Sequence, residues 1–169
     1  MKGICLVDFC FIFIRTEAQR STEHVTIDWP EQYEWKVVGR QNKNNVSSLT
    51  IIPGKETVAT ASIVGVMSGY KGMRTSNTTQ IVDVFRKGLD TCSVLTILKA
   101  DDSAAHRWVI FKVETPKTDK YPEPESDLYY CIQGEYALFE NHVAVKQPKL
   151  SPDFEQQWRK VFKESILSK

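Results

Sequence analysis

The chain has 169 residues, 41% of them hydrophobic and 25% charged, which are ordinary values for one folded domain in water. Its 22 basic and 21 acidic residues give a formal net charge of +1, so the chain lacks the strongly basic balance typical of proteins that bind nucleic acid or anionic membranes. No apolar run reaches the roughly 18 to 20 residues that a membrane-spanning helix needs. We therefore expect no nucleic-acid partner and no stable membrane insertion after processing.

The first 18 residues bear on where the protein is located. Lys2 provides a positive start, Ile4 to Ile14 form an apolar run broken only by Asp8, and Thr16-Glu17-Ala18 supplies small side chains at the cleavage subsites. This layout is typical of a secretory signal peptide. The alternative is a first β-strand of a cytoplasmic protein, buried on both faces, because a charge within the apolar run of a signal peptide is costly.

The next part of the chain alternates polar and apolar residues, which is the period of half-buried strands. Glycines at 65 and 69 indicate bulges or bends within the last of these strands. Aromatic residues gather in this half, where they either line a ligand pocket or, as we expect, fill the core. The predicted strands are His24–Trp29, Tyr33–Arg40, Val46–Ile52 and Val58–Tyr70, and the aromatic residues are Trp29, Tyr33, Trp35 and Tyr70.

A helix over Thr79–Leu89 follows, since Ile81, Phe85 and Leu89 recur at helical spacing and Asn77 or Thr78 can cap it. The chain then returns to strand patterns, and short connections favour antiparallel pairing. The predicted strands are Ser93–Leu98, Arg107–Glu114, Asp127–Gln133 and Tyr136–Lys146.

The strand Arg107–Glu114 carries apolar residues on both of its faces. Val109, Phe111 and Val113 lie on one face, and Trp108 and Ile110 lie on the other. A central strand with the sheet covered on both sides is therefore expected.

The segment Thr115–Ser126 contains three prolines and several charges, so it is predicted to be a loop. Its length makes it a candidate functional segment, and the carboxylates Glu123, Glu125 and Asp127 could bind a cation or a basic partner. The alternative, which we favour, is a solvated connection.

The C-terminal helix, Pro152–Leu167, has the clearest pattern in the chain. Ser151 can cap it and Pro152 suits the first helical position. Phe154, Trp158 and Phe162, with Val161 beside them, form one apolar stripe, which we expect to pack on the sheet.

The residue types needed for common active sites are present but scattered. The three histidines, His24, His106 and His142, fall in separate predicted elements without metal-ligand spacing. A phosphate-binding glycine loop and a nucleophile elbow are both missing from the sequence. We predict no catalytic residue, no metal site and no cofactor, and an enzyme is not the expected function.

Two cysteines, Cys92 and Cys131, would remain after removal of a leader. In an oxidising compartment they could pair, closing a loop of about 40 residues and stabilising the fold by about 3 to 4 kcal/mol. The alternative is two separate buried thiols, since free cysteine behaves as a small hydrophobe.

Together these patterns predict a signal peptide at 1–18 and a single α+β domain at 19–169. An antiparallel sheet of about six to eight strands is packed by one internal helix and a C-terminal helix. This order of elements resembles the MOG1/PsbP-like sandwich proteins. The resemblance implies a protein that binds other proteins or supports complexes.

The expected function is thus that of a small exported bacterial protein, periplasmic or secreted, which acts as a non-enzymatic interaction or accessory module. Its expected partner is another protein. The alternative is a small-ligand-binding protein or enzyme that uses a cleft beside the 115–126 loop.

Overall fold

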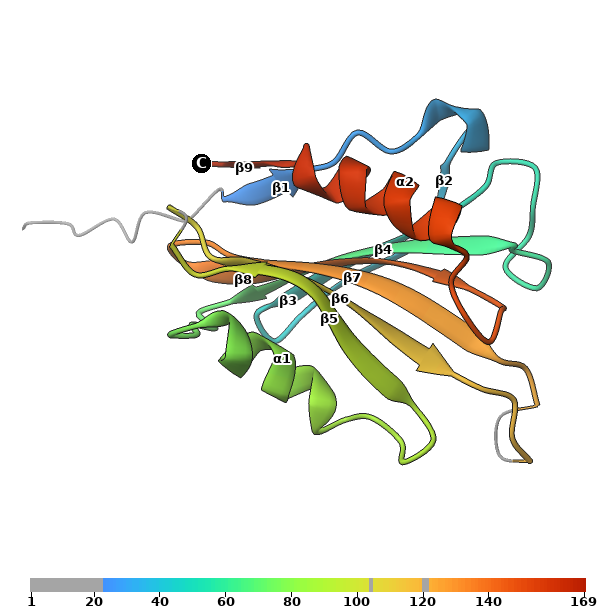
Figure 1. The fold of residues 1–169 in the computed structure, drawn as a ribbon. Helices are drawn as coiled ribbons and strands as arrows, with labels where there is room; N and C mark the ends of the chain where they lie inside the picture. Colours follow the sequence, from blue (N-terminus) through green and yellow to red (C-terminus); the bar gives the residue numbers. More distant parts are fainter. Residues whose placement is uncertain (1–22, 104, 120–121) are drawn as a thin grey trace, which may run out of the picture.

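The computed structural model describes residues 23–103, 105–119 and 122–169, and the predicted signal peptide at 1–18 lies outside them. In this part of the chain, seven strands form one sheet in which every strand is antiparallel to its neighbours. The strands are β2 Lys36–Lys43, β3 Val46–Ile52, β4 Ile63–Lys71, β5 Val94–Asp101, β6 Trp108–Thr115, β7 Glu125–Gln133 and β8 Ala137–Val145. They run across the sheet in the order β2-β3-β4-β8-β7-β6-β5 (Figure 1).

Two meanders, joined at the middle of the sheet, produce this order. Asn44 and Asn45 connect β2 to β3 with φ angles of 51° and 65°, the left-handed backbone that a two-residue hairpin turn favours. After β4 the chain passes through helix α1 (Thr78–Arg86) to β5 at the far edge. The second meander then returns strand by strand until β8 pairs with β4.

One helix lies on each face of the sheet (Figure 1). Helix α1 begins at the Asn77 cap, whose side chain accepts a hydrogen bond from the backbone N–H of Gln80 at 2.9 Å. Helix α2 (Pro152–Lys163) begins at Ser151, which accepts from the N–H of Phe154 at 3.3 Å. The predicted α+β class, with an antiparallel sheet, an internal helix and a C-terminal helix, is confirmed.

The predicted extension of the C-terminal helix to Leu167 is wrong. Helix α2 ends at Lys163, and Ile166–Ser168 forms strand β9, which pairs with β1 (His24–Thr26) in a separate two-stranded sheet. The hydroxyl of Ser165 donates to the carbonyl of Phe162 at 2.7 Å and closes the last turn. Pairing with a strand from the other end of the chain thus overrides the local helical period.

Two of the predicted strands begin later than expected. A 3₁₀ turn, η1 (Glu31–Tyr33), precedes β2 and ends at Glu34, which has a φ of 48°. Before β4, the Glu56 carboxylate accepts hydrogen bonds from the backbone N–H and the hydroxyl of Ser62, at 2.6 and 2.7 Å. Side-chain bonds of this kind stabilise turns in place of strands.

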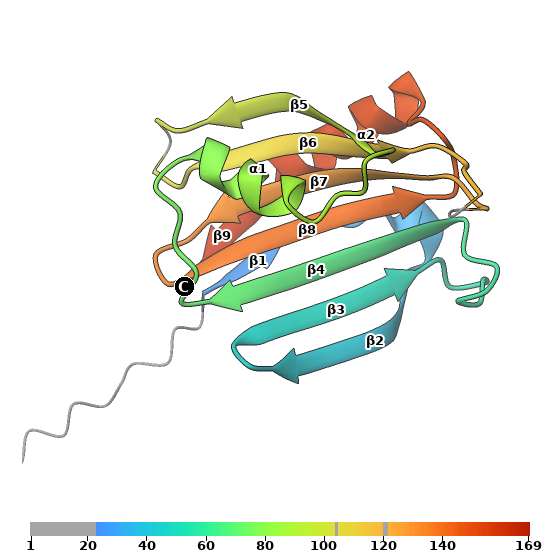
Figure 2. The same cartoon turned by 90° about the horizontal axis from the view of Figure 1, so that it is seen from below.

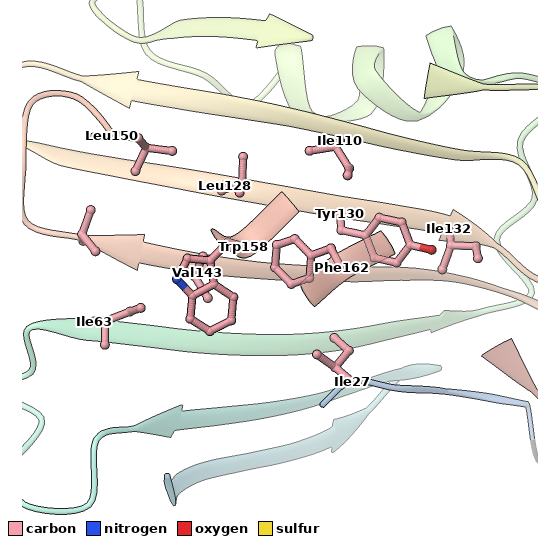
Figure 3. Packing of buried hydrophobic residues seen from close by; sticks show 11 residues of the cluster. Ile27, Ile63, Ile110, Leu128, Tyr130, Ile132, Val143, Leu150, Trp158 and Phe162 are labelled. Carbon is pink, nitrogen blue, oxygen red and sulfur yellow. The ribbon is translucent and has the colours of Figure 1, made fainter. Parts of the chain in front are cut away.

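The sheet is buried on both sides where the helices lie, as the pattern of Arg107–Glu114 predicts. Towards α1, Val109, Phe111 and Val113 pack with Ile81 and Val82 of that helix. Towards α2, the core consists of Ile27, Ile63, Ile110, Leu128, Tyr130, Ile132, Val143, Val145, Leu150, Trp158 and Phe162 (Figure 3).

Of the four N-terminal aromatic residues, Trp29, Tyr33 and Trp35 pack against the core on the α2 side, and Tyr70 packs against the core on the α1 side. The ring of Trp29 lies 5.3 Å from that of Trp35 and 5.5 Å from that of Trp158, and Tyr33 lies 4.9 Å from Trp35. The indole N–H of Trp35 donates to the carbonyl of Pro30 at 3.0 Å. This aromatic block (Trp29, Tyr33, Trp35 and Trp158) joins the segment after β1 to the terminal helix.

Gly65 allows this block to reach the sheet, and the predicted bulge there is wrong. The register of β4 is continuous, and bulges instead interrupt the two edge strands, between Val37 and Gly39 and between Ile97 and Lys99. A Cβ atom at Gly65 would lie 2.7 Å from Cζ3 of Trp29 and 2.8 Å from Cγ1 of Ile51.

We predict that Gly65→Ala lowers the free energy of unfolding by about 1 to 3 kcal/mol, because Trp29 must move away from the sheet. Urea denaturation measures this change. Gly39→Ala is the matched control, since its Cβ would lie 3.4 Å from Thr50, an ordinary contact. Equal effects of the two substitutions would contradict the close approach of Trp29.

Candidate functional site

Cys92 and Cys131 are both free thiols in the structure. Cys131 pairs with Val109, and Val109 pairs with Ala100 near the end of β5, whereas Cys92 precedes Val94 at the start of β5. The strand between Val94 and Ala100 spans roughly 20 Å. A disulfide needs Cα atoms within about 7 Å. The bridge considered from the sequence is therefore not formed.

The histidines are distributed over separate elements. His24 lies on β1, His106 lies just before β6, and His142 lies on the central strand β8. Within residues 23–103, 105–119 and 122–169, no three His, Cys, Asp or Glu side chains gather in a way that could hold a metal ion. His142 nevertheless has a carboxylate partner, Glu140, two residues earlier in the same strand. This pair was not predicted from the sequence.

The three acidic residues at the end of the predicted loop do not form one binding site. Glu123 pairs with Lys146 at 3.3 Å, Glu125 begins β7, and Asp127 lies within that strand. The loop therefore ends at Pro124, earlier than predicted, and its carboxylates do not form one cluster.

Helix α1 covers only part of its face of the sheet. In Figure 2, which views the molecule from the α1 side, the helix lies over β6 and β7, while β8, β4, β3 and β2 run uncovered. We call this side of β8, β4 and β3, together with the adjoining Asp127 and Tyr129 of β7, the open face. Tyr129 lies at its border, since its ring is 5.3 Å from that of Phe85 of α1. The other residues of the open face are Thr50 of β3, Val64, Val66, Ser68 and Tyr70 of β4, and Glu140, His142 and Ala144 of β8.

The strand register arranges the open face in rows. Val66 pairs with His142, and His142 pairs with Tyr129. The ring of Tyr129 lies 4.7 Å from that of His142 and stacks on Phe111, with centroids 4.8 Å apart and planes 8° apart. The open face thus continues directly from the aromatic core beneath α1.

A hydrogen-bonded chain of three polar side chains crosses the open face. The hydroxyl of Tyr70 donates to Oε2 of Glu140 at 2.6 Å, and Nδ1 of His142 lies 3.0 Å from Oε1 of the same carboxylate. Glu140 is only 6% exposed. A charge this buried is costly unless it is paired and hydrogen-bonded, and both oxygens of Glu140 have such partners.

The pKa values follow from these contacts. Burial by itself raises the pKa of Glu140, but the hydrogen bond and charge of His142 and the hydrogen bond from Tyr70 hold it below its ordinary value. Burial raises the pKa of Tyr70, and the neighbouring carboxylate of Glu140 raises it further. Glu140 is therefore a fixed negative charge at neutral pH.

Asp127 behaves in the opposite way. It is 7% exposed and lies between Val113 and Ala144 in the register, with no carboxylate hydrogen bond to another described residue. Burial raises its pKa to about 7, and the charges of Glu125 and Glu140 act in the same direction while His142 opposes them. The open face therefore holds one ionised carboxylate and one carboxyl that titrates near neutrality.

Perturbed carboxyl groups often mark functional sites, but this arrangement lacks other parts of an active site. Cys131 shares the face, yet it is fully buried and its pKa is raised by burial, so it is a poor nucleophile. Both carboxyls are also largely enclosed, since Asp127 is 7% and Glu140 6% exposed.

A groove lies on the opposite face, between β1 and the strands β2, β3, β4 and β8. Its volume is about 520 Å³, and it is not beside the 115–126 loop. The lining residues are Glu23, His24, Val25, Arg40, Gln41, Asn42, Ser47, Ser48, Leu49, Met67, Ser68, Gly69, Phe139 and Asn141. The carboxylate of Glu23 accepts hydrogen bonds from the N–H groups of Glu135 and Tyr136, at 2.8 and 3.0 Å.

Asn141 is the unusual residue of this groove. Its side chain is 2% exposed, and its Nδ2 atom has no hydrogen-bond partner among the described residues. The indole N–H groups of Trp29 and Trp158 also lack partners, but these rings lie against one another and an N–H can point at a ring face. An unpaired primary amide costs about 1 to 3 kcal/mol.

Neither protein-family models nor curated proteins match this chain. The resemblance to MOG1/PsbP-like proteins therefore stays a prediction. Among the described residues, no helix combines the length and the apolar character needed to cross a membrane.

Sequence reasoning missed both surfaces. The signal for the open face was the pair Glu140 and His142, two ionisable residues two positions apart in a strand, which must share one side of it. Asn141, between them, points to the opposite side. Tyr70, which donates to Glu140, and Asp127, which shares the face, come from other strands, and only the register brings them together.

Asp127→Asn tests the raised pKa. Between about pH 4 and about pH 7 the folded protein keeps a proton at Asp127 that the unfolded chain releases, so this residue makes stability fall as the pH rises through that window. We predict that the variant is about 2 to 4 kcal/mol more stable than the wild type at about pH 8, with little difference at about pH 4.

Urea denaturation across this pH range measures the difference. Asp119→Asn is the control, because it makes the same chemical change at an exposed position whose charge is not among those that shift Asp127. A gain for Asp127→Asn that does not grow with pH, or an equal gain for Asp119→Asn, would count against a neutral, buried Asp127.

Proposed function

We propose that this protein is a non-enzymatic accessory protein that binds another protein through the open face. The observation that carries this proposal is the uncovered half of the sheet between α1 and the β2 edge (Figure 2). Large exposed surfaces with apolar side chains mark interaction sites on soluble domains.

The composition of the open face supports this function. Val64, Val66 and Ala144 supply apolar area, and Tyr70 and Tyr129 supply aromatic rings of the kind enriched in protein interfaces. The hydrogen bonds of Tyr70 and His142 to Glu140 hold this part of the surface in one arrangement. A surface ordered before binding loses less entropy when a partner docks.

The same geometry argues against catalysis on this face. Small-molecule sites are usually concave and enclose most of their ligand. Asp127 and Glu140 are instead only 7% and 6% exposed, and the groove is on the opposite side of the sheet. A flat partner surface is a better fit than a small substrate.

We further propose that the protein is exported, on the basis of the predicted signal peptide. N-terminal sequencing of the protein purified from its native host tests this. We predict a mature chain that starts after Ala18. Recovery of a chain that still begins at Met1 or Lys2 from an exported fraction would contradict cleavage.

Site-specific photo-crosslinking tests the docking surface. We predict that a benzophenone amino acid at Val66 of the open face gives a discrete adduct with a different protein in the native host, identified by mass spectrometry. Val58, which is 70% exposed on the loop before β4, is the control position.

Three outcomes would refute the docking proposal. They are an absence of adducts from Val66, the same adduct from both positions, or an adduct formed only with a second copy of this chain.

A second candidate function, the binding of a small ligand, is favoured by one observation, the unpaired amide of Asn141 in the wall of the groove.

A further inference from the structure

The groove opposite the open face has the dimensions of a ligand site. Its volume of about 520 Å³ falls within the range of about 300 to 1,000 Å³ that is usual for small-molecule pockets. A second hollow of about 300 Å³ adjoins it and shares Gly69 and Phe139 in its lining. A Cβ atom at Gly69 would lie 3.1 Å from Ser47 Oγ and 3.3 Å from Phe139, so the glycine keeps the floor open.

One row of paired residues crosses the groove from β2 to β8. Along it lie, in order, a cationic side chain, two apolar side chains and an amide. Arg40 of β2 pairs with Leu49 of β3, Leu49 pairs with Met67 of β4, and Met67 pairs with Asn141 of β8. All four residues line the groove. Three strand spacings separate Arg40 from Asn141, a distance of about 14 Å.

The outer end of this row is cationic. The Arg40 guanidinium forms no ion pair with the described residues and lies at an exposed position of the edge strand. The carboxylate of Glu23, the acidic residue of the groove, is held by the two N–H groups at Glu135 and Tyr136. A guanidinium matches the planar geometry of a carboxylate with two parallel hydrogen bonds.

The inner end of the row is a buried donor. The Nδ2 group of Asn141 is without a partner. Rotation about the Cβ–Cγ bond of an asparagine is broad, so this group can turn towards a ligand seated on Met67. A carbonyl or similar oxygen placed there would satisfy an amide that the folded protein leaves unpaired.

We propose that this groove binds a linear, medium-chain carboxylate that carries an oxygen acceptor at its far end. The carboxylate pairs with Arg40, the alkyl chain lies on Leu49 and Met67, and the distal oxygen accepts from Asn141. This site is on the other face of the sheet from the proposed docking surface and does not depend on it.

Monomethyl suberate and octanoate are the probes, because both have an eight-carbon acid chain and only the former carries a distal carbonyl. Isothermal titration calorimetry measures their affinities. We expect the wild type to bind monomethyl suberate about tenfold more tightly than octanoate, since octanoate leaves the amide unpaired.

Two variants separate the two ends of the row, and a third is their control. Asn141→Leu should abolish the preference for the ester while retaining octanoate binding. Arg40→Gln should weaken both ligands by a similar factor, about threefold or more. Arg74→Gln, at an exposed position after β4, is the matched control and should change neither affinity.

The thermal midpoint of Asn141→Leu should not fall, because the substitution removes an unpaired polar group. If that variant does not fold, Gly69→Val fills the floor of the groove and should abolish binding of both probes. Lack of binding to the wild type, equal affinity for the two probes, or a preference that persists in Asn141→Leu overturns the proposal. Persistence of binding in Gly69→Val overturns it as well.

Discussion

The width of the β-sheet relative to the two helices of the described chain is the constraint on which the other features depend. Seven strands about 4.8 Å apart span about 29 Å, whereas one helix with its side chains is about 10 Å wide. One helix lies on each face, nine residues long on one side and twelve on the other. Each face must therefore be completed by other segments or stay uncovered.

On the α2 side the N-terminal segment supplies most of the missing cover. Trp29, Tyr33 and Trp35 extend the apolar layer beyond Trp158, and the β1–β9 pair holds both ends of the described chain beside the helix. Trp29 can approach the strands because Gly65 has no side chain. The sheet is no longer covered beyond the aromatic block. The groove over β2, β3 and β4 lies in this uncovered part.

On the α1 side no such segment is present in the described part of the chain. The sheet there carries polar side chains that hydrogen-bond to one another. Glu140 and His142 satisfy one another within the sheet, which makes a buried charge tolerable. Asp127 has no such hydrogen-bond partner among the described residues, and burial together with the charges of Glu125 and Glu140 raises its pKa to about 7. One face thus carries a paired charge and an unpaired acid a short distance apart.

The sequence by itself determined the elements whose signals are local. The cap at Ser151, the stripe of Trp158 and Phe162, and the two apolar faces of Arg107–Glu114 each follow from neighbouring residues, and with them the α+β class. These local signals extended the terminal helix too far, because Ile166–Ser168 forms a strand only when β1 is present to pair with it. Tertiary structure alone decided the register that unites Tyr70, Glu140 and His142, the row from Arg40 to Asn141, and the separation of Cys92 from Cys131. The physical reason is that cross-strand neighbours are set by pairing between distant segments, and no local period encodes that pairing.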